Sequence, residues 1–195
     1  MRRKIRFTNT ICLLAGLIFA TLASVPSLAR AMPASEKFSA VAYLPSGGRT
    51  ANVDIIIDGY TSDQQAQQLQ SLLFDNGPNA LLKALDRMDR LGKIQGVGNL
   101  SFYEFKVVRS HPIEGGRHII AVADRPISFL EAYYNTRSSD YKFGVMELDL
   151  HNKGDHEEGE GQLIYAAKVK VVGPGQIEIE NYGIDPVRLI GVRKL

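Results

Sequence analysis

Four charged residues with aromatic neighbours form the leading candidate site of this sequence. Asp124, Arg125, Arg137 and Asp140 flank a stretch that is rich in phenylalanine and tyrosine. Arginine beside aromatic rings is suited to an anionic or sugar-like ligand, because the guanidinium donates paired hydrogen bonds. The same residue types also suit a structural role, in which Asp–Arg pairs hold irregular loops and tyrosines cover the ends of a sheet. The structural interpretation is favoured, and a ligand site at these four residues is a hypothesis.

A second candidate lies where His151 and His156 flank an acidic loop. Asp149 and Glu160 match the first and last ligand positions of an EF-hand calcium loop, but Lys153 occupies a ligand position between them, and a protonated lysine does not bind calcium. Zinc would need further histidines converging from elsewhere in the chain, which a sequence does not show. We therefore predict a solvated hairpin loop here, with no metal and no cofactor.

Motifs that mark a nucleophile or a bound phosphate are missing from the chain. There is no Gly-x-Ser-x-Gly elbow, no His-Glu-x-x-His and no glycine-rich loop opening a helix. His111 and His118 have no candidate partner nearby in the sequence, so both are interpreted as surface residues. These observations favour a protein that is not an enzyme.

The N-terminal segment has the pattern of an export signal. A basic start at Arg2–Arg6 is followed by an apolar run over Ile11–Val25, and Ala29 and Ala31 supply the small residues of a cleavage site. The apolar run is shorter than the roughly 20 residues that a membrane-spanning helix needs. We therefore expect cleavage after Ala31, no stable membrane span afterwards, and a single domain over residues 32–195 in the periplasm or outside the cell.

Removal of this signal changes the charge of the protein. The full chain has 23 basic and 21 acidic residues, and residues 1–31 hold five of the basic ones and none of the acidic ones, so the remainder has a formal charge of −3. The basicity belongs to the signal, and nucleic acid is not an expected partner. The one cysteine, Cys12, also lies in the signal, which excludes disulfides and thiolate chemistry from the remaining domain.

The elements that must position these residues are predicted to be strands with one helical insertion. Ser62 is the expected N-cap of a first helix, and a second helix starts at Pro78 and is expected to end at Gly92. The predicted strands are Phe38–Leu44, Ala51–Asp58, Lys93–Val97, Ser101–Arg109, Arg117–Ala123, Lys142–Leu150, Gln162–Val172, Gln176–Tyr182 and Val187–Val192. The fold class is α+β: a mostly antiparallel, strongly curved sheet, as a sandwich or a barrel, with a two-helix segment packed on it.

One hairpin is specific enough to predict its register. If Gly173–Gly175 forms a three-residue loop, Val169 lies opposite Ile179 on one face, and Lys170 lies opposite Glu178 on the other. Apolar pairs on one face and opposite charges on the other are typical of a correct antiparallel register.

Two runs carry a resemblance, namely Asp124–Ala132 and Gln176–Gly183. Together with the signal, they resemble uncharacterised exported proteins of soil bacteria, acidobacterial in style. The resemblance implies no activity and no site residues. Three hypotheses remain: a non-enzymatic exported module for binding or structure, which leads; a β-barrel that binds a small molecule in an apolar cavity near Tyr133–Tyr141; and a hydrolase or isomerase whose groups converge only in the folded chain.

Overall fold

The computed structural model describes residues 35–195, except 45–47, 99–101, 128–140, 174–175 and 182–184. The predicted signal therefore lies outside the described residues. The elements are β1 (Glu36–Leu44), β2 (Arg49–Ile57), α1 (Asp63–Asn76), α2 (Pro78–Asp86), β3 (Gly92–Gly96), β4 (Phe102–Phe105), β5 (Val107–Ile113), β6 (Gly116–Ala123), β7 (Phe143–Lys153), β8 (His156–Gly173), β9 (Gln176–Asn181) and β10 (Val187–Lys194).

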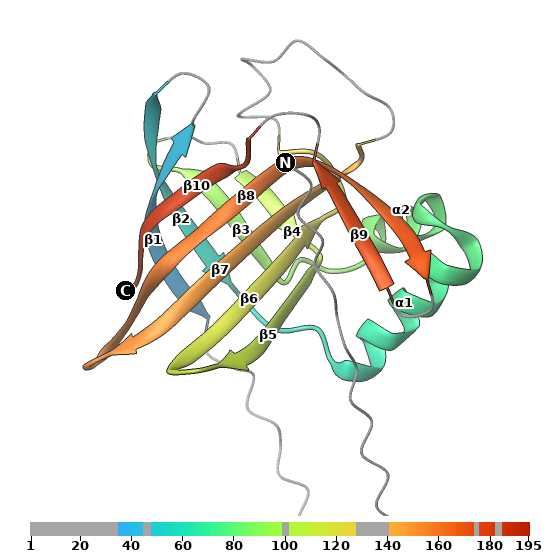
Figure 1. Ribbon diagram of the computed structural model, residues 1–195, viewed down its shortest axis with the longest axis horizontal. Coiled ribbons are helices and arrows are strands. Elements are labelled where there is room, and N and C mark those ends of the chain that lie inside the picture. The colour runs from blue at the N-terminus through green and yellow to red at the C-terminus, as the bar shows by residue number, and fades with distance from the viewer. Residues whose placement is uncertain (1–34, 45–47, 99–101, 128–140, 174–175, 182–184) are drawn as a thin grey trace, which may run out of the picture.

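The strands form one antiparallel sheet that curls into a nearly closed barrel (Figure 1). The strands pair in the order β4-β3-β2-β1-β10-β8-β7-β6-β5, so β10 returns to pair with β1. Strand β9 lies off this path and pairs with β8. The two ends of the path, β4 and β5, are joined through Lys106, whose backbone N–H donates to the Val122 carbonyl at 2.9 Å. If β4 and β5 count as one bent strand, this is an eight-stranded up-and-down arrangement. The predicted curved antiparallel sheet is confirmed, in its barrel-like form.

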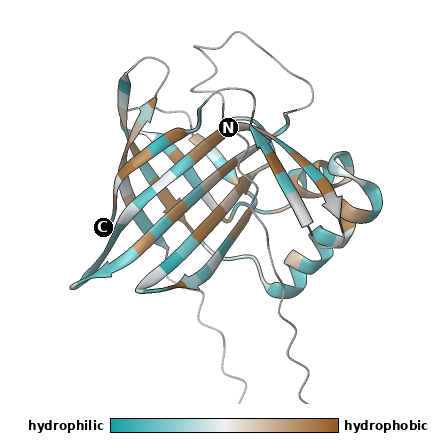
Figure 2. Ribbon diagram, in the orientation of Figure 1, coloured by the Kyte–Doolittle hydropathy of each residue, from teal (hydrophilic) through white to brown (hydrophobic). Residues whose placement is uncertain are grey.

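Alternation along strands such as β1 and β6 separates the interior of the barrel from its outer face (Figure 2). On β1, for example, Phe38, Ala40 and Ala42 are buried and the residues between them are more exposed. Because successive side chains of a strand point to opposite faces, this two-residue period fills the interior with apolar groups. The longer predicted strand Ser101–Arg109 is instead divided at Lys106 into β4 and β5.

The helical insertion follows β2 and begins as predicted. Ser62 caps α1, because its hydroxyl accepts a hydrogen bond from the Gln65 N–H at 3.2 Å, and Pro78 opens α2. The predicted end of the second helix at Gly92 is wrong: α2 ends at Asp86, and Gly92 is the first residue of β3. A Cβ on Gly92 would lie 2.7 Å from the Ile56 carbonyl oxygen, so this glycine permits β2 and β3 to approach closely rather than ending a helix.

A second apolar cluster holds the helices against the outside of the barrel (Figure 1). Leu73 of α1 and Leu85 of α2 are buried there against Val145 of β7, and Val169 of β8 belongs to the same cluster. The predicted register of the hairpin is confirmed, since Val169 pairs with Ile179 and Lys170 with Glu178. The hairpin of β8 and β9 thus contributes to the apolar layer that holds the helices.

Candidate functional site

The interior of the barrel is filled by large side chains. An eight-stranded barrel has an interior that is either filled by side chains or wide enough for one small ligand. Here Phe38, Phe105, Ile94, Met146 and Leu148 are all fully buried in one apolar cluster with residues from every strand around the barrel. The described residues therefore form a solid core.

One end of the barrel is closed by four charged groups and one tyrosine, which we call the end cluster: Glu36, Tyr60, Arg117, Glu157 and Lys194. The Arg117 guanidinium donates to Glu36 at 2.9 Å and to Glu157 at 2.5 Å. The Lys194 ammonium donates to Glu36 at 2.6 Å and lies 3.3 Å from Glu157, and the Tyr60 hydroxyl donates to Glu36. Two cations therefore balance two carboxylates.

The pKa values of Glu36 and Tyr60 keep these two members of the end cluster in their ordinary charge states. Burial alone would raise the pKa of Glu36, but hydrogen bonds from Arg117, Lys194 and Tyr60 outweigh burial and lower it to about 2. Burial and the Glu36 carboxylate raise the pKa of the Tyr60 hydroxyl, so it stays protonated. Because every group already has a partner, the cluster is suited to closing the barrel rather than to chemistry.

The other end of the barrel is covered by Ile127. Its side chain is fully buried, its N–H donates to the Tyr165 carbonyl at 2.8 Å, and it packs where a Cβ on Gly144 would lie, 2.8 Å from its Cγ1. Both ends of the interior are thus occupied by side chains of the described residues.

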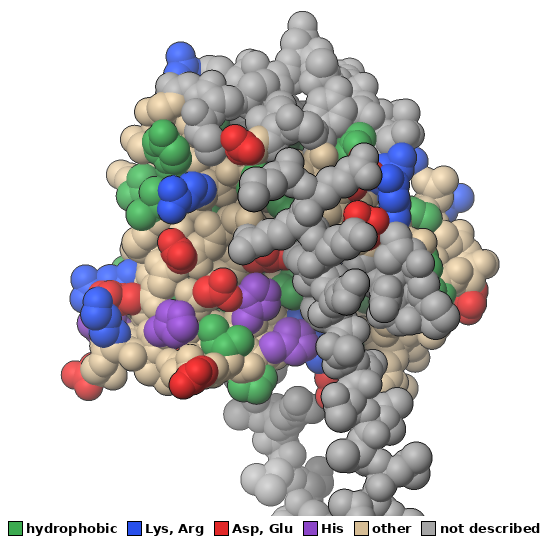
Figure 3. Space-filling view, viewed as in Figure 1, with side chains coloured by type: hydrophobic (Ala, Val, Ile, Leu, Met, Phe, Trp, Pro, Cys, Tyr) green, Lys and Arg blue, Asp and Glu red, His purple; other side chains and the backbone are tan. Residues whose placement is uncertain are grey.

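The outer face of β5–β8 is divided into a covered half and an uncovered half. Towards one end of the strands, outward residues such as Val107, Val122 and Val145 belong to the apolar cluster under the helices. Towards the other end, the same strands carry histidines and carboxylates. Histidine and acidic side chains gather on this lower part of the face (Figure 3).

Strand register places four of these ionisable residues in one row. His111 of β5 lies opposite His118 of β6, His118 lies opposite Asp149 of β7, and Asp149 lies opposite Glu160 of β8. His118 and Asp149 are in direct contact, with Nδ1 and Oδ1 2.5 Å apart. The fold therefore brings together residues that lie far apart in the chain.

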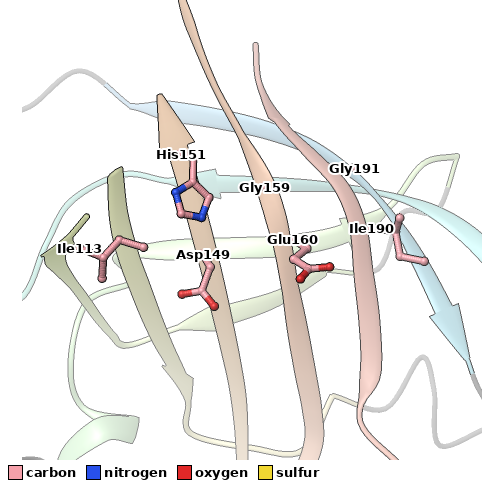
Figure 4. A pocket seen from close by; sticks show the side chains of 7 residues that line it. All are labelled: Ile113, Asp149, His151, Gly159, Glu160, Ile190 and Gly191. Carbon is pink, nitrogen blue, oxygen red and sulfur yellow. The ribbon is translucent and has the colours of Figure 1, made fainter. Parts of the chain in front are cut away.

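A hollow of about 670 Å³ lies beside this row, and we call it the outer hollow (Figure 4). Its floor includes glycines of β8 and of a bulge in β10, where the register shifts between Leu189 and Val192. Side chains are small at these positions, which leaves room between the flanking residues. The outer hollow is lined by Ile113, Asp149, His151, Gly159, Glu160, Ile190 and Gly191.

The outer hollow combines unpaired ionisable groups with exposed apolar ones. Glu160 and His151 make no hydrogen bond or ion pair within the part of the chain that the structure describes. Ile113 and Ile190 flank them and are 37% and 42% exposed, and Val41, the cross-strand neighbour of Ile190, is 37% exposed. Other described carboxylates, such as Glu158, have a cationic partner.

The predicted site residues are only partly described. Asp124 and Arg125 form an ion pair at 3.2 Å, with the Asp124 side chain 4% exposed and the Arg125 side chain 61% exposed. Arg137 and Asp140 lie outside the described residues, so the predicted convergence of all four remains a prediction. Tyr141 donates from its hydroxyl to Glu180 of β9 at 2.9 Å. The acidic loop is the hairpin between β7 and β8, as predicted, and His156 there contacts Glu158 at 2.8 Å.

Sequence reasoning missed the contact between His118 and Asp149. These residues are 31 positions apart, and the long interval between the end of β6 at Ala123 and the start of β7 at Phe143 hides the register of the two strands. The available signal was the alternation on both strands, because Asp149 lies between the buried Leu148 and Leu150, and His118 precedes the buried Ile119.

The chain matches no protein-family model, no curated protein and no solved structure. Among the helices in the described ranges, none has the length and apolar composition needed to cross a bilayer.

Proposed function

We propose that this chain is an exported, non-enzymatic binding module that engages its partner through the outer hollow, with the barrel as a rigid support. The observation that carries the proposal is the contrast between the two faces of the sheet. The inward face is filled and closed at both ends, whereas the outward face has a hollow with unpaired carboxylate and imidazole groups.

A small-molecule ligand inside the barrel is less well supported. Such a ligand would need an apolar cavity, and the described interior is occupied by side chains such as Phe38, Phe105 and Met146. The segment Tyr133–Tyr141, where that cavity was expected, lies mostly outside the described residues. The outer hollow is the better candidate because its residues are accessible.

The chemistry of the outer hollow favours a basic polypeptide segment as the partner. Asp149 and Glu160 are adjacent carboxylates on neighbouring strands, and like charges in this arrangement repel each other. A lysine or arginine side chain between them would relieve this repulsion. Ile113 and Ile190 on either side offer apolar surface to the residues that flank that basic group. The proposed partner is therefore a protein segment with a basic centre and apolar neighbours.

The test uses two short synthetic peptides, one with two central lysines between leucines and one with glutamates in place of the lysines. We expect the lysine peptide to shift the backbone NMR signals of residues around the outer hollow and the glutamate peptide to shift none of them. Raised salt should weaken the binding, because the attraction is between partly exposed charges.

Matched variants locate the binding. Glu160→Gln and Ile190→Ser should each lower the affinity for the lysine peptide several-fold. Val97→Ser should leave this affinity unchanged, since Val97 is 58% exposed but lies on the loop after β3. Equal binding of the two peptides, or shifts confined to the ends of the barrel, would exclude the outer hollow as the binding surface.

A hydrolase is the second candidate, and the contact between His118 and Asp149 favours it. A carboxylate that holds a histidine is a common general-base arrangement. If the protein is a hydrolase, it should turn over an acyl substrate, and His118→Ala should abolish that turnover. Peptide binding without such turnover, tested on p-nitrophenyl acetate, distinguishes the binding module from the enzyme.

A further inference from the structure

Two histidines from different strands are brought side by side on the outer face of the barrel. His111 of β5 and His118 of β6 are directly opposite each other in the antiparallel pairing. The Cβ atoms of such neighbours are about 4.5–5.5 Å apart, which allows two imidazole rings to reach one ion. Both side chains point outward, because Ile119, next to His118, and Val108, three residues before His111, point into the core.

Asp149 orients one of these rings. Its carboxylate lies 2.5 Å from Nδ1 of His118, and a carboxylate can only accept, so Nδ1 carries the proton. The lone pair of His118 is therefore on Nε2. In metalloproteins a ligating histidine commonly donates its other N–H to a carboxylate in this way, which fixes the ring and makes it a better ligand.

The cation on the strand of His111 is already engaged. Arg109 lies two residues before His111, and its guanidinium donates to the Thr61 carbonyl at 2.8 Å and to Asp63 at 2.6 Å.

We infer that His111 and His118 bind one divalent transition-metal ion, with Asp149 as the residue that positions His118. Imidazole ligands favour Zn²⁺, Cu²⁺ and Ni²⁺ over Ca²⁺ and Mg²⁺. The described residues contain no group of three or more histidine, cysteine, aspartate or glutamate side chains arranged around one ion. The ion is therefore held by the two rings, and water fills its remaining coordination positions. This inference shares Asp149 with the outer hollow, but neither metal ligand, His111 or His118, lines that hollow.

The test is calorimetric titration of the untagged protein with Zn²⁺ and, separately, with Ni²⁺ at pH 7.5. We expect saturation at one equivalent for both ions and no heat from Mg²⁺. His111→Ala and His118→Ala should each weaken binding by at least about tenfold, and Asp149→Asn by about tenfold as a loss of orientation. Lowering the pH to about 5 should release the ion, because protons then compete for the rings.

His156→Ala is the matched control, since His156 is also a histidine on this face but contacts Glu158 at 2.8 Å on the hairpin of β7 and β8. The affinity of this variant for Zn²⁺ and Ni²⁺ should equal that of the unchanged protein. Circular dichroism of each variant checks that the fold is kept, and His111→Gln replaces His111→Ala if the latter unfolds. Absence of saturable binding, or equal weakening in His156→Ala, would overturn the site. His111→Ala separates this inference from the peptide experiment, because His111 does not line the outer hollow and the variant should bind the lysine peptide unchanged.

Discussion

Single residues in the end cluster stabilise the fold through ion pairs and hydrogen bonds. Glu36, on the first strand, accepts hydrogen bonds from Arg117 and from Lys194, which is 158 positions away. Removing one member of such a partly buried set leaves its partners with uncompensated charge. The cluster therefore ties the first and last described strands, β1 and β10, to β6 and β8.

The first prediction concerns the pH dependence of this residue. The pKa of Glu36 is about 2 in the folded protein and near 4.5 as its ordinary value. Because the folded pKa is the lower one, the carboxylate stabilises the fold fully above about pH 4.5, and this contribution disappears as the pH falls towards 2. The contribution of the ionised Glu36 carboxylate to the free energy of unfolding is on the order of 3 kcal/mol.

Urea unfolding at several pH values measures this contribution. Glu36→Gln should be less stable than the unchanged protein by roughly that amount at pH 7, and the two should converge at pH 2. A difference that stays constant over the whole pH range would contradict the assigned role of the Glu36 carboxylate.

At the scale of elements, glycines permit the backbones of β6, β7 and β8 to approach each other closely. A Cβ on Gly159 would lie 1.8 Å from the Asp149 carbonyl oxygen, and one on Gly116 would lie 1.9 Å from the Leu150 carbonyl oxygen. The approach of these backbones is possible only without a side chain. The strong curvature of the sheet and the floor of the outer hollow both depend on it.

The second prediction follows from this close approach. Gly159→Ala should lower the free energy of unfolding by at least about 2 kcal/mol, because the added methyl group collides with the backbone of β7. Gly59→Ala is the control: its Cβ would meet only Leu91 Cδ2, at 3.5 Å, and the change should stay within about 0.5 kcal/mol. Equal stability of both variants in urea unfolding would show that β7 and β8 are not held this closely.

At the scale of the whole molecule, the interior of the barrel is one apolar core. The apolar cluster includes residues from both ends of the described chain, from Phe38 to Val192. Such a core is closely packed, and removal of a large side chain leaves a cavity that the surroundings fill only in part.

The third prediction tests whether the interior is filled. Met146 is fully buried, so Met146→Ala should cost about 2–5 kcal/mol in the free energy of unfolding. The new apolar cavity should take up benzene, seen as NMR shifts of core methyl groups, and the unchanged protein should not. Val97→Ser, an exposed position, should behave like the unchanged protein. Benzene uptake by the unchanged protein would revive the interior as a ligand site.

Local patterns in the sequence were sufficient for the strands, the caps and one hairpin. Alternation located most strands within a few residues, Ser62 marked the start of α1, and opposite charges fixed Lys170 against Glu178. These features depend on neighbours within one turn or one hairpin, so a single segment contains the information. Gly92 was misplaced because its role is set by Ile56 on another strand.

The tertiary structure alone decided which residues meet. Closure of the sheet depends on the pairing of β10 with β1, the two ends of the described chain. The contact of His118 with Asp149 depends on the register between β6 and β7, which lie far apart in the sequence. The end cluster likewise joins five residues from separate strands and a loop. Contacts of this kind follow from the path of the whole chain, because burial of the shared core, not local propensity, selects the register that creates them.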